Sequence, residues 1–183
     1  MLKISFFIMM MFVGPYFVQA QEAAVDVSYP KNEIVLETGK GEVALWVEDA
    51  RANKLLGQTA SEEALIPASD IATSFYAYMA SSLKQAGYTV VPYSNEIAAG
   101  LLVRIRSIHY RSSKEMFRSK VEVTAVIESK RNASNVTKTY QATVEDQFAL
   151  KASASDNGAM IGKALATVAQ ACLSDPETIH AAE

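Results

Sequence analysis

Residues 101–110 read LLVRIRSIHY, and this stretch decides the fold. In its first half, inward and outward residues alternate, as in a β-strand with one buried face. The predicted inward residues are Leu101, Val103 and Ile105. The apolar parity then changes, because Ile108 and Tyr110 continue the set from even positions. A slip of one residue would turn half of the apolar side chains to water, so we predict a β-bulge near residues 106–107.

Two further alternating segments follow this strand, and the loop RNASN at 131–135 separates them. The first has the predicted inward residues Phe117, Val121, Val123, Ala125 and Ile127. The second has the predicted inward residues Val136, Tyr140, Ala142, Val144 and Phe148. Together with residues 101–110, these segments predict a three-stranded antiparallel meander.

One amphipathic helix is predicted on each side of the meander. The upstream helix begins at a cap, Ser69 or Asp70, and ends at Gly87, which is suited to a left-handed C-terminus. The downstream helix is expected to begin at a cap, Ser155 or Asp156, and to end before Pro176. Its glycines, Gly158 and Gly162, are spaced for close packing, which we expect to be against the sheet.

The predicted fold class is α+β: a two-layer sandwich with a mainly antiparallel sheet and two helices packed on one face. We expect a single α/β domain over residues 41–174, including a strand at 42–49 and an irregular loop at 50–68. An N-terminal arm at 21–40, with one short strand at 34–36, precedes the domain, and a C-terminal tail at 175–183 follows it.

Residues 1–20 have the pattern of a signal peptide, with Lys3 ahead of an apolar run. Cleavage is expected between Ala20 and Gln21, while an uncleaved N-terminal anchor is the alternative. A lipoprotein signal would place a cysteine where Gln21 stands. The single cysteine is Cys172, on the apolar face of the downstream helix, where we expect it to be buried.

The composition excludes several classes of protein. The chain has 183 residues, a net charge of −3 and one cysteine, so neither an internal disulfide framework nor a zinc cluster of cysteines is expected. The acidic pI of about 5.5 argues against a nucleic-acid partner. No catalytic motif is present, and the two histidines are His109 and His180. We therefore expect no enzyme activity, no catalytic or metal site and no cofactor, and no transmembrane span in the mature chain.

Asp49 and Arg51 form a candidate motif pair, because residues two apart in an extended segment share a face. The pair fits an acid–base or anion-binding role, or a structural ion pair at the end of a strand. The sequence favours the structural interpretation.

A basic cluster follows the first strand of the meander. If the first two strands pair as a hairpin, four cations share its outward face: Arg104, Arg106, Arg118 and Lys120. Such a face could bind an anionic partner. The alternative, which the sequence favours, is a solvated face balanced by Glu122, Glu128 and Glu145.

Several segments together resemble the YajG-type lipoproteins of Gram-negative bacteria. They are Val47-x-Asp49-x-Arg51, Leu56-Gly57, LKQAGY at 83–88, LLVRI at 101–105 and GKAL at 162–165. The resemblance covers about Glu42 to Ser174. It implies a cell-envelope protein with a mixed α/β domain and no established catalytic residues. Because Gln21 replaces the lipid-bearing cysteine of the family, lipid anchoring does not carry over.

The sequence therefore predicts an exported periplasmic protein. Association of this protein with the outer membrane is left open. The predicted role of the protein is a non-catalytic interaction module with an envelope protein partner, such as an accessory subunit of an outer-membrane or envelope-spanning assembly. The alternative is a periplasmic binding protein for a small ligand, a glycan or an anionic lipid, with its site between residues 50–68 and the sheet.

Overall fold

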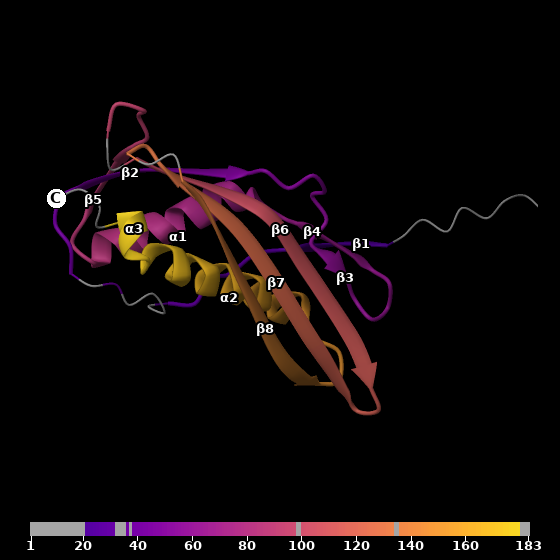
Figure 1. Ribbon diagram of the computed structural model, residues 1–183. Helices are drawn as coiled ribbons and strands as arrows, with labels where there is room; N and C mark the ends of the chain where they lie inside the picture. The colour runs from indigo at the N-terminus through magenta and orange to yellow at the C-terminus, as the bar shows by residue number, and fades with distance from the viewer. Residues whose placement is uncertain (1–20, 32–35, 37, 98–99, 134–135, 180–183) are drawn as a thin grey trace, which may run out of the picture.

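The computed structural model describes residues 21–31, 36, 38–97, 100–133 and 136–179 (Figure 1). Its elements in chain order are β1 (Glu22–Val25), β2 (Glu42–Asp49), β3 (Gly57–Gln58), β4 (Ala64–Pro67), α1 (Ile71–Gln85), β5 (Thr89–Pro92), β6 (Gly100–Glu115), β7 (Arg118–Arg131), β8 (Thr137–Ala149), α2 (Ala154–Leu173) and α3 (Pro176–Ile179). The leader with Ala20, most of the expected strand at 34–36, and His180 lie outside the described residues.

The meander predicted from the alternating pattern is present. β6 pairs antiparallel with β7 from Leu101 opposite Arg131 to Glu115 opposite Arg118, and β7 pairs antiparallel with β8. The register of β6 against β7 shifts between Ile105 and Ser107. This is the predicted bulge, and it keeps the apolar side chains on the inner face on both sides of the shift.

The predicted fold class is wrong in two respects. The sheet is mixed, because β2 runs parallel to β5 and to β6, β3 runs parallel to β6, and β1 runs parallel to β4. The sheet also curls strongly into a half-barrel instead of forming one flat layer of a two-layer sandwich (Figure 1).

The parallel pairing follows from the connection between β2 and β5. Parallel neighbours need a crossover of a dozen or more residues, and the chain between these strands includes α1. The expected loop at 50–68 is also wrong in part, since it contains the short strands β3 and β4. β2 pairs with the first part of β6, and β3 pairs with a later part of the same edge of β6.

The helices cover different parts of the sheet: α1 contacts β2 and β5, while α2 contacts β7, β8 and β1. The N-cap of α1 is Asp70, which is one of the two residues predicted for this position. Its Oδ1 accepts a hydrogen bond from the Thr73 amide at 2.6 Å. The predicted cap of α2 is wrong. Ser153 is the N-cap, and Asp156 takes the third helical position of a capping box.

The two glycines of α2 pack against the end of β1 and the segment that follows it, so the expected packing against the sheet holds at its β1 edge. A Cβ atom on Gly158 would lie 1.9 Å from the Asp26 carbonyl oxygen, and one on Gly162 would lie 1.9 Å from that of Ser28. The Ser28 amide also donates to the Gly158 carbonyl at 3.3 Å. The missing side chains let residues 26–28 cross directly over the helix.

The core lies between the inner face of the sheet and the two helices. Phe75 and Met79 of α1 and Ile161 and Leu165 of α2 are fully buried there, with Ile127 of β7 among the sheet residues that face them. Cys172 is also fully buried, as predicted. None of the described helices is long and apolar enough to cross a membrane.

Candidate functional site

Asp49 and Arg51 form a bidentate ion pair at the end of β2. Arg51 Nε donates to Asp49 Oδ1 at 2.8 Å, and Nη2 donates to Oδ2 at 2.9 Å. The Arg51 side chain is 3% exposed and that of Asp49 is 12% exposed. Arg51 Nη1 also donates to the carbonyl groups of Lys54 and Leu55. The pair therefore fixes the loop between β2 and β3.

The same contacts set the ionisation of Asp49. Burial alone would raise the pKa of its carboxyl group. The hydrogen bonds and charge of Arg51, with Lys54 Nζ at 2.9 Å, outweigh burial and lower the pKa to about 2. Asp49 is thus an ionised, fully engaged carboxylate. It is poorly suited to proton transfer near neutral pH.

An open hollow lies between this loop and the outer face of β6 and β7. It measures about 920 Å³, and its lining includes Arg51, Leu55, Arg106, His109 and Arg111. It occupies the place where the sequence put a ligand site, between residues 50–68 and the sheet. In the described part of the chain, neither His109 nor Arg111 makes a salt bridge.

The four cations predicted to share a face are all on the outward face of the hairpin, but they form two separate pairs. Arg104 lies opposite Glu128, ten positions along β7 from Arg118, which corresponds to about 33 Å of strand. By the register, Arg104 and Arg106 lie towards the start of β6, whereas Arg118 and Lys120 lie next to the turn at the far end of the hairpin.

Carboxylates and an amide oxygen lie against these cations. Arg104 pairs with Glu48 at 3.1 Å, and Arg106 pairs with Glu128 at 3.3 Å. Lys120 pairs with Glu145 at 2.8 Å, which raises the pKa of the lysine and lowers that of the glutamate. Arg118 donates to the Gln147 side chain at 3.3 Å. Each charge thus has a local partner on the same face.

The free edge of β8 is the feature that a partner chain could use most directly. β8 is 13 residues long, and β7 is the strand that pairs with it in the described structure. Its 13 register positions against β7 continue without a bulge, and its sequence contains no proline. Natural sheets commonly blunt their edges with bulges and prolines, and β8 has neither device.

The register identifies which backbone groups of β8 point outward. The Tyr110 amide donates to Leu56 at 2.7 Å, so its backbone faces away from β7. Its register partner Val123 must then face β8, and Val144 opposite Val123 must face β7. The neighbouring residues Thr143 and Glu145 therefore direct their N–H and C=O groups to the free edge.

The sequence missed one exposed feature, the turn of the β6–β7 hairpin. Phe117 was predicted to be an inward residue, and this is wrong, since it is 79% exposed. The same prediction is wrong for Val136, which precedes β8 and is 58% exposed. Phe117 shares the parity of Val121, but it lies in the two-residue turn between β6 and β7. The charged residues that bracket the turn, Glu115 and Arg118, are the signal that could have marked it.

The comparisons with known proteins come from two kinds of match. A family model described as "Uncharacterized lipoprotein" matches residues 31–181, which is most of the chain. The chain therefore belongs to this family of uncharacterised lipoproteins, and the resemblance seen in the sequence is confirmed at that level. No curated protein matches the chain.

The solved structures that are similar to the chain at low sequence identity include the following three. The hypothetical protein CT253 from Chlamydia trachomatis is 8% identical, with a TM-score of 0.40 over 80% of this chain and 99% of that one. An uncharacterised protein is 14% identical, with a TM-score of 0.36 over 81% and 92%. Lipoprotein GNA1162 from Neisseria meningitidis is 13% identical, with a TM-score of 0.31 over 57% and 83%.

Proposed function

We propose that this protein is a non-catalytic interaction module of the cell envelope that binds an extended segment of a protein partner along β8. The family of uncharacterised lipoproteins and the signal-peptide pattern of residues 1–20 support an envelope location on the periplasmic side. The observation that carries the binding role is the long free edge of β8.

Strand addition fits this edge in both hydrogen bonding and packing. An added strand would bond to the outward backbone groups of Thr143 and Glu145, which gives affinity independent of sequence, whereas the next outward N–H, that of Gln147, already donates to Asp146 Oδ1 at 2.7 Å. The inward side chains of Val144 and Phe148 are only partly buried against the core. Alternate side chains of the partner could cover them, and this contact would supply specificity.

Proline substitution tests the role of the edge without removing a bond inside the sheet. Thr143→Pro removes an outward N–H, so pairing with β7 keeps its hydrogen bonds. Thr143→Val is the matched control, since it alters the side chain and keeps the N–H group. A photo-crosslinking residue at position 141 should yield a defined adduct in cells. Thr143→Pro should abolish the adduct and Thr143→Val should keep it.

Two results would contradict the proposal. One is an adduct that survives Thr143→Pro in protein that folds as the wild type does, as judged by circular dichroism. The other is crosslinking that recovers only abundant envelope proteins, and recovers them equally from position 46 on the exposed side chain of Trp46.

The hollow supports a second candidate function, the binding of a small anionic ligand or glycan. The observation that favours it is Arg111, which makes no salt bridge to any described residue and lies beside His109 in an open space of about 920 Å³. Arg111→Gln should then weaken binding of an anionic glycan, measured by calorimetry, while Thr143→Pro should leave it unchanged. Equal binding by wild type and Arg111→Gln would remove this candidate.

A further inference from the structure

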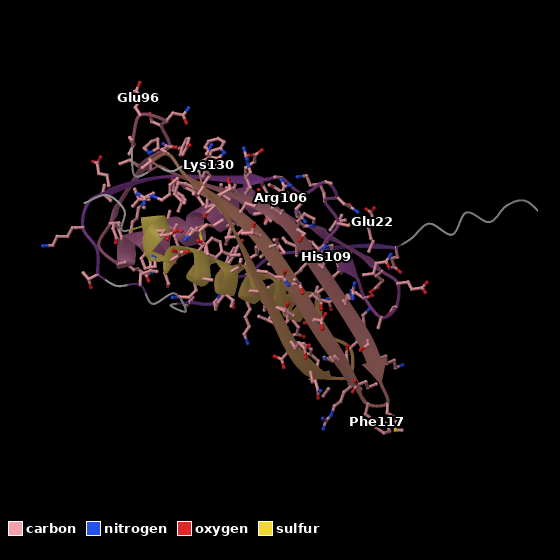
Figure 2. The ribbon with its side chains drawn as sticks, viewed as in Figure 1. Glu22, Glu96, Arg106, His109, Phe117 and Lys130 are labelled. Atoms are coloured by element: carbon pink, nitrogen blue, oxygen red, sulfur yellow. The ribbon has the colours of Figure 1, made fainter. Side chains whose placement is uncertain are left out.

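The tip of the β6–β7 hairpin carries three exposed apolar side chains. Met116, Phe117 and Leu150 are 89%, 79% and 76% exposed. The Leu150 amide donates to the Phe117 carbonyl at 3.3 Å, so the end of β8 adjoins the turn. Figure 1 shows β6, β7 and β8 extending beyond the N-terminal end of α2, and Figure 2 shows Phe117 at the far end of these strands.

The fold itself does not require apolar residues at these positions. Two-residue hairpin turns favour Asn, Asp or Gly, whereas Met116 and Phe117 form the turn here. Leu150 has a φ of 75°, in the left-handed region where glycine is easier to place. Two apolar side chains thus occupy a turn in which polar residues are common, and a third, Leu150, occupies a backbone conformation that suits glycine better.

Cations surround this apolar tip. Lys114, Arg118 and Lys151 lie beside it, around a depression of about 350 Å³ under the turn. Within the described residues, Lys114 and Arg118 make no salt bridge, and Lys151 pairs with Glu63 at 2.6 Å. Glu115 is the one carboxylate among the residues around this depression. The charge around the tip is therefore positive on balance.

We propose that the tip, defined as Met116, Phe117 and Leu150, inserts into the interface of a lipid membrane that carries anionic headgroups. Exposed apolar side chains with flanking cations are the pattern by which proteins lie on such a surface. The apolar side chains would leave water for the acyl boundary, while Lys114 and Arg118 would meet the headgroups. The edge of β8 plays no part in this contact, so the inference goes beyond the proposed function.

Vesicle binding by the full-length protein, purified as cells export it, tests the proposal. The probes are vesicles of phosphatidylcholine alone and of phosphatidylcholine mixed with phosphatidylglycerol. Phe117→Ser should weaken binding to the anionic vesicles by at least about tenfold, because a large apolar side chain is lost. Arg118→Gln should weaken it by about fivefold. Val136→Ser is the matched control, since it removes an exposed apolar side chain from the turn between β7 and β8.

A fluorescent side chain locates the contact independently of the N-terminal residues, which all variants share. Phe117→Trp in a Trp46→Phe background should show a blue shift on anionic vesicles and quenching by brominated lipid. Thr143→Trp in the same background should show neither change. Failure of the protein to bind anionic vesicles, or binding without quenching at position 117, would overturn the proposal. In that case, contact with a protein partner would be the remaining explanation for the exposed apolar side chains of the tip.

Discussion

Arg51 holds Asp49 through two parallel hydrogen bonds of 2.8 and 2.9 Å, and Arg51 is almost completely buried. Such a pair is costly to break from one side, because the remaining charge stays buried without its partner. The Asp49–Arg51 pair, for which the sequence left an acid–base or anion-binding role open, therefore joins the end of β2 to the loop that leads to β3.

Asp49→Ala should lower the free energy of unfolding by about 3 kcal/mol. Denaturant unfolding followed by circular dichroism measures this change. Lys54→Ala is the control, because its side chain is 61% exposed and should contribute about 0–1 kcal/mol. Equal effects of the two substitutions would contradict a structural role for the buried pair.

The stability contributed by Asp49 should depend on pH in the acid range. Its pKa falls from 3.8 to about 2 on folding, so the unfolded chain binds the proton first. The contribution, about 2 kcal/mol, is complete above about pH 4 and is lost as the pH falls towards 2. The stability difference between wild type and Asp49→Asn should therefore shrink over this range. A difference that stays constant with pH would oppose this assignment.

Gly162→Ala should destabilise the protein, although alanine is the better helix former by about 1 kcal/mol. The added Cβ would meet the Ser28 carbonyl oxygen, so residues 26–28 must move away from α2. We expect a loss of about 1–3 kcal/mol and faster proteolysis of the N-terminal segment. Ala159→Gly, at an exposed position of the same helix, should cost about 1 kcal/mol without affecting that proteolysis. Stabilisation by Gly162→Ala would show that residues 26–28 do not lie directly against α2 at Gly162.

Cys172 should be inert in the folded protein. Burial raises the pKa of its thiol to about 12, so very little thiolate is present near neutral pH. A thiol reagent should label it only in denaturant, with a midpoint that matches global unfolding. Rapid labelling of the native protein would show that α2 opens locally.

The parts of the fold that depend on local pattern could be predicted from the sequence. Alternation revealed the meander, and its change of parity revealed the bulge at Ile105–Ser107. The parallel pairing of β2 with β6 depends on contacts between residues more than 50 positions apart, and no local pattern encodes it. β3 has two residues, which is too short for any periodicity.

The candidate sites were harder to predict from the sequence than the meander, because they depend on contacts between residues that are distant along the chain. The pattern placed Arg104 on an outward face, but its partner Glu48 comes from β2 through the unpredicted parallel register. Phe117 continued an inward parity, and only the position of the turn shows that it lies at the hairpin tip. The free edge of β8 depends on the order of strands in the whole sheet.

Amide hydrogen exchange along β8 tests the central claim most directly. In the isolated protein, the amides of Thr143 and Glu145 should exchange rapidly, while the amide of Val144, directed to β7, should exchange slowly. In a complex captured from envelope extract, Thr143 and Glu145 should become protected and Val144 should not change. Protection of Thr143 and Glu145 already in the isolated protein, or no added protection in the complex, would contradict binding at the edge of β8.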